Sequence, residues 1–427
     1  MKQKDIHLDV YNDKSILHYE NMISEFKEGL QSPSAIIRYN KIKKELDDGF
    51  LEELVKRPID LTGAGLDDET KGLIYDLVFK LTSEVGRALI GLAFLQLTIK
   101  SIEPEQCIRL HKGGSKANAF SWEDGISMRT LDSSYNTPFL RKYNLLSLNK
   151  DGLFMTRSLA ENYPYSRLYK AEMRGPFKEW ISIVDKIEDG SIKPLIALQY
   201  LMSLLRYRSD GFQALADKAV EVVSRYNITN LSQVQKLLRT FFEHTRYGAR
   251  AFEVVMHAYM QAIFEMRDSG ETLSPMTQMR SANKKHGNIG DIELKEGAVV
   301  TEAWDAKYGK PYLYEELDEL KEKVQTNPGI MRAGFVVNSY FDSFAELSEK
   351  ADEVANFTGI DIYLLTFDEW IEYQLNAYNI KDARSQLELG HRWIIAVVES
   401  FAQKRRQLAP IDEPCDEWLN SLLNVFK

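Results

Sequence analysis

The chain is organised around residues 290–310, which read GDIELKEGAVVTEAWDAKYGK. Within this stretch Ile292 and Leu294 alternate with polar residues, residues 296–297 are a Glu-Gly pair, and the β-branched run 299–301 follows. Alternation of this kind on both sides of a short, glycine-containing turn is typical of two antiparallel strands. The stretch therefore predicts a β-hairpin.

The predicted hairpin carries two acids and a lysine that can act together. Asp305 and Lys307 are two residues apart on the second strand, so a pleated strand points both side chains to one face. Asp291 begins the first strand, and a bend or bulge in the second strand would bring its carboxylate near that of Asp305. Two neighbouring carboxylates repel each other unless a cation lies between them.

The chemistry of these side chains favours a magnesium site. Hard oxygen ligands without His or Cys suit Mg²⁺, which keeps several waters and binds one or two carboxylates together with a substrate phosphate. We therefore expect Asp291 and Asp305 to be metal ligands and Mg²⁺ to be the cofactor. Lys307, beside such an ion, is suited to hold or deprotonate an attacking water and to neutralise charge that develops on phosphorus.

An acid at the start of a hairpin, followed by acid-x-Lys on its second strand, resembles the motif of the PD-(D/E)XK nuclease superfamily. Asp291 matches the first acid of that motif, and residues 305–307 match its (D/E)XK element. The chain departs from the usual pattern at Gly290, where the family has proline. The resemblance implies that Asp291, Asp305 and Lys307 are catalytic.

The segments that flank the hairpin extend the resemblance over about residues 246–375. Residues 248–260 read as an amphipathic helix, similar to the helix that precedes the hairpin in these nucleases and often supplies a glutamate, for which Glu253 is the candidate. The elements expected after the hairpin follow the core order of the superfamily: helix 314–324, strand 333–338, helix 344–356 and strand 361–365. Another interpretation stays open, in which Asp-x-Lys is a surface ion pair worth about 0–1 kcal/mol and Glu253 is a rim residue of an ordinary helix.

The overall composition is that of a globular protein of two or three domains, with 427 residues, 44% hydrophobic and 27% charged. Cys107 and Cys415 are far apart, so we expect neither a disulfide framework nor a zinc site, and a cytoplasmic location fits. No apolar run is long enough to span a bilayer, so no membrane partner is expected. The net charge of −9 argues only weakly against a nucleic-acid partner, because the placement of basic residues decides binding to phosphates.

We expect residues 1–240 to form a mostly helical DNA-recognition region and residues 241–427 to form the nuclease domain with C-terminal helices. Helical spacing extends from about residue 19 to residue 57, with a break at Pro33. A second, long helix is expected over residues 69–100, where acidic residues favour the helix start.

Residues 111–175 are the candidate recognition segment. A helix expected at 138–143 is followed by residues 145–148, an Asp-Gly turn and residues 153–157. A helix followed by a small hairpin resembles the second half of a winged-helix module, which can place the helix in the major groove of DNA. The DNA contacts expected from this segment are Arg141, Lys142 and Arg157. The alternative interpretation is that these cations only solubilise the surface.

A turn-rich basic loop at residues 273–288 immediately precedes Asp291. Its cations would lie beside the metal, where a phosphodiester backbone must pass. The DNA contacts expected from this loop and from the end of the hairpin are Arg280, Lys284, Lys285, His286 and Lys310. As a lone histidine, His286 is expected to contact phosphate or solvent rather than to act as a general base.

The fold class that we expect is α+β, with a helical, winged-helix-like N-terminal part and a C-terminal nuclease core built on a mixed sheet. The resemblance implies Mg²⁺-dependent, sequence-specific cleavage of double-stranded DNA, as in type II restriction endonucleases. A structure-specific or repair nuclease and a non-catalytic winged-helix DNA-binding regulator are the alternatives. A homodimer is expected because a symmetric site needs two active centres. No nucleotide cofactor is expected, because residues 112–116 lack the spacing of a P-loop.

Overall fold

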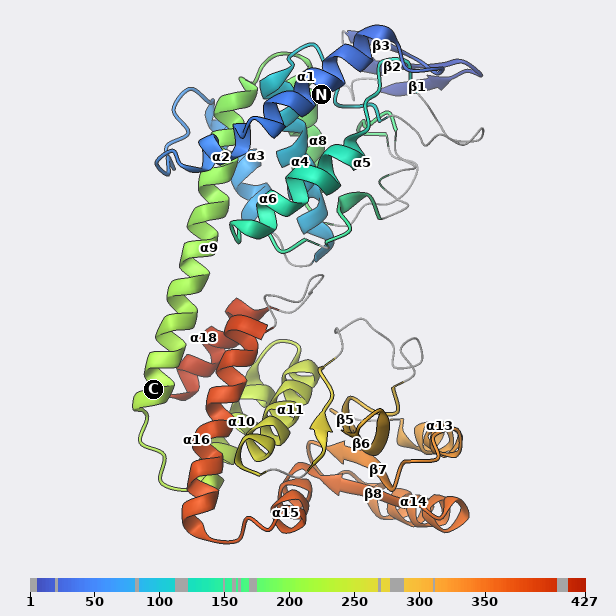
Figure 1. The fold of residues 1–427 in the computed structure, drawn as a ribbon, viewed down its shortest axis with the longest axis vertical. Helices are drawn as coiled ribbons and strands as arrows, with labels where there is room; N and C mark the ends of the chain where they lie inside the picture. Colours follow the sequence, from blue (N-terminus) through green and yellow to red (C-terminus); the bar gives the residue numbers. More distant parts are fainter. Residues whose placement is uncertain are drawn as a thin grey trace. The chain divides into compact units, whose positions relative to one another are not determined.

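The protein combines helices with two β-sheets (Figure 1). The computed structural model describes residues 6–19, 22–80, 84–111, 122–148, 150–155, 159, 163–168, 175–267, 270–276, 288–309, 312–404 and 414–427. The chain divides into two compact units, the first built mainly from residues up to Gly211 and the second mainly from residues after it. None of the helices in the described ranges has both the length and the apolar character that crossing a membrane requires.

A three-stranded antiparallel sheet opens the first unit. Its strands are β1 (His7–Val10), β2 (Lys14–Tyr19) and β3 (Met22–Lys27), paired in that order. The prediction of helix from residue 19 was wrong over β3. Ile23 and Phe26 have helical spacing, but their register with β2 puts them on opposite faces, so Phe26 is buried while Ile23 is 70% exposed.

The rest of the first unit is helical and packs around one apolar core. Its elements are α1 (Pro33–Asp47), α2 (Phe50–Val55), α3 (Asp68–Phe79), α4 (Glu84–Ile102), α5 (Met128–Leu131), the π-helix Asp132–Asn136, α6 (Thr137–Lys142), a 3₁₀ turn (Leu153–Met155), α8 (Phe177–Glu188) and the start of α9 (Pro194–Arg225). The long helix predicted over 69–100 is thus two helices, α3 and α4. Residues 194–225 form one continuous helix, α9.

The small hairpin expected in the recognition segment is not formed by the described residues. Residues 145–148 have no strand partner there, and residues 153–155 form the 3₁₀ turn. A wing exposes one face of its strands, whereas Leu145, Leu146 and Leu148 are all buried in the core. The winged-helix interpretation is therefore not confirmed, and residues 149, 156 and 157 of the expected hairpin lie outside the described residues.

A buried carboxylate holds this segment in place instead. Asp132 accepts hydrogen bonds from the Asn136 amide, the Thr137 hydroxyl and the backbone N–H of Leu153. Burial raises the pKa of Asp132, while the three donors favour its charged form. Because the backbone N–H of Leu153 donates to Asp132, it is not available for pairing with a neighbouring strand.

The second unit is built on a five-stranded mixed sheet in the order β4-β5-β6-β7-β8. The strands are β4 (Thr272–Leu273), β5 (Ile292–Glu296), β6 (Val299–Lys307), β7 (Arg332–Val337) and β8 (Asp361–Thr366). The first three pair antiparallel and the last three pair parallel. The predicted hairpin at residues 290–310 is confirmed as β5 and β6, with Gly297 at a positive φ of 61° in the turn.

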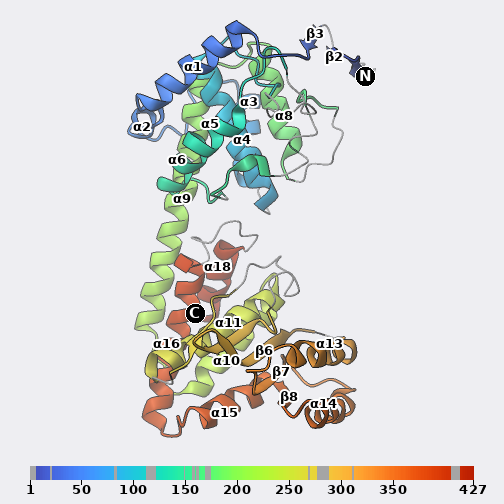
Figure 2. The same ribbon diagram turned by 45° about the vertical axis from the view of Figure 1, so that its right-hand side comes forward.

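Helices cover both faces of this sheet (Figure 2). The helices of the second unit are the end of α9, α10 (Leu231–His244), α11 (Gly248–Met266), α13 (Leu313–Gln325), α14 (Phe344–Thr358), α15 (Phe367–Ala377), α16 (Ala383–Glu399) and α18 (Cys415–Val425), with a π-helix at Ser400–Lys404. Trp304 packs on one face with α11, α15 and α16, and Ala303 packs on the other with α13 and α14. Side chains alternate along β6, so Asp305 and Lys307 share the face of Ala303.

Candidate active site

A β-bulge in the hairpin decides which residues meet at its open end. Lys295 pairs with Val300, but its neighbour Leu294 pairs with Glu302, so Thr301 is an extra residue on β6. An extra residue on one strand shifts the pairing of everything beyond it by one position. Without the bulge, the acids at the open end would be out of register.

With the bulge, the two aspartates are opposite each other. Ile292 pairs with Trp304, and continuing that register by one residue puts Asp291 opposite Asp305. The backbone N–H of Ala306 donates a hydrogen bond of 3.1 Å to Asp291 Oδ2, which fixes the Asp291 carboxylate against β6. The sequence-based expectation that a bulge brings the two carboxylates together is confirmed.

Asp305 is an electrostatically strained carboxylate. Its side chain is only 14% exposed. Burial, together with repulsion from the Asp291 carboxylate, holds the pKa of Asp305 well above its ordinary value, and the nearby Lys307 ammonium only partly offsets the rise. A cation placed between the two carboxylates would relieve this strain.

Lys307 is held by carboxylates from two elements. Its Nζ is 3.1 Å from Asp305 Oδ2 and 3.0 Å from Glu316 Oε1 on α13. Burial lowers the pKa of Lys307, but the two carboxylates outweigh burial and the net shift is upward. The ammonium therefore stays protonated at neutral pH, which favours hydrogen-bond donation over proton abstraction.

Glu316 is a residue of this cluster that the sequence interpretation missed. It lies in the first turn of α13, where acids are common because they favour the positive end of a helix, so its position did not single it out. Its Oε1 binds Lys307, while its Oε2 is buried and has no hydrogen-bond partner among the described residues. A buried acceptor without a donor is costly, and Glu316 therefore has capacity for a further polar contact.

Of the other acids of the hairpin, Glu296 is exposed at the turn, whereas Glu293 and Glu302 are buried and have structural partners. Glu293 accepts the backbone N–H of Ile289 at 2.7 Å and lies 3.5 Å from the Lys295 ammonium. Glu302 is likewise buried, accepts the Trp304 indole N–H at 2.5 Å and pairs with the Arg332 guanidinium at 3.0 Å. The facing pair Asp291 and Asp305 is thus chemically distinct from the remaining acids of its own hairpin.

Glu253 lies on α11, and its described contact is within that helix. It accepts a hydrogen bond from the Arg250 guanidinium, one turn earlier on α11, and α11 packs on the face of the sheet opposite to Asp305. A role for Glu253 at the metal stays a prediction.

Two of the expected DNA contacts lie in described segments. Arg141 donates a hydrogen bond to the Leu148 carbonyl, so its guanidinium supports the chain after α6. Lys142 is 62% exposed, and its Nζ lies 3.9 Å from Glu52 and 5.1 Å from the Tyr143 ring centroid. The other six expected contacts lie outside the described residues: Arg157, Arg280, Lys284, Lys285, His286 and Lys310.

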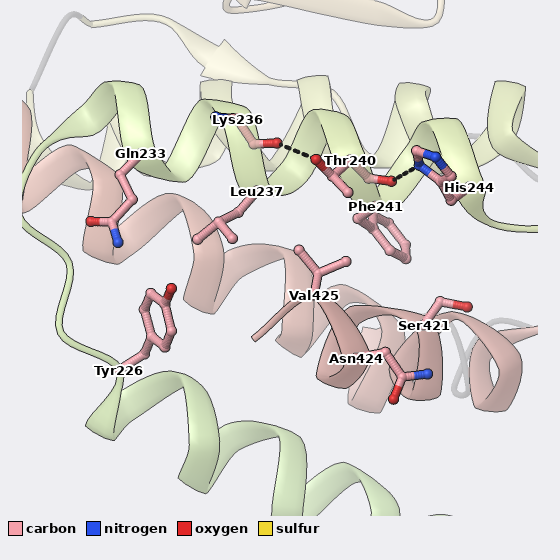
Figure 3. Close-up of a pocket in the computed structure, with 10 residues that line it drawn as sticks. All are labelled: Tyr226, Gln233, Lys236, Leu237, Thr240, Phe241, His244, Ser421, Asn424 and Val425. Carbon is pink, nitrogen blue, oxygen red and sulfur yellow. Dashed lines mark hydrogen bonds between the residues drawn. The ribbon is translucent and has the colours of Figure 1, made fainter. Parts of the chain in front are cut away.

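A pocket of about 600 Å³ between α10 and α18 is separate from the carboxylate cluster (Figure 3). It is lined by Tyr226, Gln233, Lys236, Leu237, Thr240, Phe241, His244, Ser421, Asn424 and Val425. Figure 3 shows the hydrogen bond of 2.9 Å between His244 Nδ1 and the Thr240 carbonyl oxygen of the same helix. Because these lining residues include no carboxylate or cysteine, the pocket lacks the ligands of a metal-dependent hydrolytic site.

Comparisons with known proteins leave the family open. Neither the models of protein families nor the curated proteins give a match to this chain. The resemblance to PD-(D/E)XK nucleases therefore depends on the residues and geometry described above.

Proposed function

We propose that the protein is a Mg²⁺-dependent endonuclease that hydrolyses phosphodiester bonds of double-stranded DNA at a PD-(D/E)XK site. The observation that carries the proposal is the buried Asp305 carboxylate, held opposite Asp291 and 3.1 Å from Lys307. The order of α11, β5, β6, α13, β7, α14 and β8 supports it, because the same order accompanies this motif in the superfamily.

The donor set at the hairpin fits Mg²⁺. Asp291 and Asp305 would hold the ion, and two carboxylates leave its other positions to water and to a substrate phosphate. Bound there, the ion would supply positive charge to the scissile phosphate and lower the pKa of a bound water. Among the described residues, no His or Cys forms a metal-binding group with this pair, which disfavours a zinc centre at this place.

Three groups of the chain would assist the ion: the Lys307 ammonium, the Glu316 carboxylate and the backbone N–H of Ala306. The protonated Lys307 donates hydrogen bonds to the attacking water or to a phosphate oxygen, and it neutralises charge as the P–O bond breaks. Glu316 holds the Lys307 side chain in place from α13. The N–H of Ala306 orients the Asp291 carboxylate, so that both acids are preorganised before DNA binds.

Sequence-specific cleavage by a homodimer, as in type II restriction endonucleases, is the form of this activity that we favour. A long first unit joined to the proposed nuclease unit suits a protein that reads its target before cutting. Two copies related by a two-fold axis would bring one centre to each strand of a symmetric site.

Digestion of unmethylated plasmid and phage DNA, with Mg²⁺ or with chelator, tests this function. We expect discrete fragments that need Mg²⁺, and their ends would map the recognition site. Nicking that depends on DNA structure rather than sequence would favour the repair nuclease and refute the sequence-specific form. Tight binding without cleavage under any metal condition would overturn the enzymatic proposal and favour the regulator.

A further inference from the structure

A second group of metal-binding side chains lies in the first unit, on the sheet formed by β1, β2 and β3. His7 and Asp9 on β1 and His18 on β2 each offer a ligand atom, and these three atoms lie within 4.8 Å of one another. Among the described residues, this is the group of three or more His, Cys, Asp or Glu side chains that satisfies the distances of a metal site. It belongs to a different unit from Asp291 and Asp305.

Strand geometry brings the three side chains to one face. His7 and Asp9 are two residues apart on β1, so both point to the same side of the sheet. His7 pairs directly with His18 across the β1–β2 ladder, and opposed residues share a face. The positions are therefore fixed by backbone pairing, which supports a preformed site.

The Asp9 carboxylate is the point on which both imidazoles converge. Asp9 Oδ2 is 3.0 Å from His18 Nε2 and 3.9 Å from His7 Nε2. The two rings are stacked, with centroids 4.0 Å apart and planes inclined by 10°. Ligand atoms of a tetrahedral zinc site are separated by about 3.3 Å, given Zn–N bonds near 2.0 Å. The separations of the carboxylate oxygen from the two imidazole nitrogens, 3.0 and 3.9 Å, lie on either side of this value.

The donor set selects the class of ion. Two imidazoles and one carboxylate bind Zn²⁺ and neighbouring divalent transition metals, whereas Mg²⁺ prefers all-oxygen surroundings. The side chains of His7, Asp9 and His18 are 55%, 45% and 28% exposed, so an ion can enter from solvent and keep a water as its fourth ligand.

We propose that His7, Asp9 and His18 bind one Zn²⁺-class divalent ion on the exposed face of the N-terminal sheet. The ion ties the short edge strand β1 to β2 and leaves one coordination position open to solvent. It is independent of the Mg²⁺ that we propose for the hairpin of the second unit.

Titration of the full chain with Zn²⁺, after removal of metals and of any affinity tag, tests the site. We expect one equivalent to bind. His18→Gln and Asp9→Asn should each weaken binding at least about 10-fold, since loss of a ligand costs no less than loss of a residue that supports one. His244→Gln, which alters an exposed histidine elsewhere, serves as the matched control and should leave the affinity unchanged.

Two further measurements separate this site from others and from misfolding. The Asp305→Asn variant should retain the Zn²⁺ equivalent, and excess Mg²⁺ should not displace it. Co²⁺ bound in place of Zn²⁺ should give a visible absorption band that is lost in His7→Gln/His18→Gln, while the circular dichroism of that variant stays native. Absence of saturable Zn²⁺ binding, or undiminished binding by a natively folded double variant, would overturn the proposal.

Discussion

At the scale of single residues, the proposed centre contains two carboxylates that repel each other, and a metal ion bound between them would relieve this repulsion. Asp305 has a raised pKa in the folded chain because it is buried and faces Asp291. A carboxyl group of this kind binds its proton more tightly in the native state than in the unfolded state. The stability that it contributes is therefore present at low pH and is lost as the pH rises from the ordinary value near 3.8 towards the raised value.

Replacement of this carboxyl group by a neutral amide, Asp305→Asn, should remove that loss. In the presence of chelator we expect the Tm of the variant minus that of the wild type to increase as the pH rises above about 4. Thermal unfolding over this pH range measures the difference. Mg²⁺ should then raise the Tm of the wild type and not that of the variant. A difference that does not change with pH would show that Asp305 is not strained.

The contact between Glu316 and Lys307 gives a second prediction at this scale. Removing the carboxylate by Glu316→Gln withdraws a group that raises the pKa of Lys307. We expect cleavage about 10-fold slower with unchanged DNA affinity, and the alkaline limb of the pH–rate profile should move to lower pH. Glu315→Gln, at the exposed neighbouring position of the same helix, is the control. An unmoved alkaline limb would leave Glu316 with a packing role only.

The candidate site was predictable from sequence where side chains follow strand alternation, and not where they come from elsewhere in the chain. Asp305 and Lys307 share a face of β6 as their i, i+2 spacing requires. Glu316 escaped prediction because the path of the chain between β6 and α13 sets which first-turn acid reaches Lys307. The contact of Arg141 with the Leu148 carbonyl was not predicted either. The sequence shows only that a basic residue lies near a loop, and this is equally compatible with a DNA contact.

At the scale of elements, the packing of the hairpin explains why residue 290 is glycine. A Cβ atom on Gly290 would lie 2.7 Å from the carbonyl oxygen and 2.9 Å from the carbonyl carbon of Trp304. Real Cβ atoms do not approach backbone atoms so closely, so any side chain at this position would push β5 away from β6. Gly290 thereby permits the close approach that puts Asp291 opposite Asp305.

The Gly290→Ala substitution should therefore affect the site through the backbone. We expect a loss of about 1–3 kcal/mol in the free energy of unfolding, and a loss of cleavage larger than this destabilisation explains. Denaturant unfolding and cleavage assays measure the two effects. Gly72→Ala is the control, since a Cβ there meets nothing within 4 Å on α3. Wild-type cleavage by Gly290→Ala would contradict the proposed role of the close approach.

The elements themselves were predicted unevenly. The alternation of Ile292 and Leu294 and the β-branched run 299–301 gave β5 and β6 correctly, although helices cover both faces of the sheet. The same reasoning misassigned β3, where Ile23 and Phe26 match a helical period by chance. From the sequence we expected only that the second strand bends or bulges somewhere, and the structure places the bulge at Thr301.

At the scale of the whole molecule, the two units divide into a part proposed to recognise DNA and a part proposed to cut it. Of the two candidate DNA contacts in the described segments, Lys142 is the better one to substitute. Arg141 also donates a hydrogen bond to the Leu148 carbonyl, so its substitution would disturb the fold as well. Charge reversal by Lys142→Glu should weaken DNA binding without changing the Mg²⁺ dependence of cleavage. It should lower the slope of log K against log salt by about 1.

Fluorescence anisotropy across a range of salt concentrations measures this slope. Lys56→Glu reverses an exposed lysine of the same unit, outside residues 111–175, and serves as the control. Equal affinity and equal slope for Lys142→Glu and the wild type would remove this residue from the recognition surface.

The central claim is that Asp305 and Lys307 belong to a metal-dependent phosphodiesterase centre. It is tested most directly by single-turnover cleavage of plasmid DNA with Mg²⁺, comparing the wild type with Asp305→Asn and Lys307→Met at saturating protein. We predict Mg²⁺-dependent cleavage by the wild type and a loss of at least about 100-fold in each variant, with DNA binding and a native circular dichroism spectrum retained. Wild-type rates in either variant, or no cleavage by the wild type with any divalent ion, would contradict the claim.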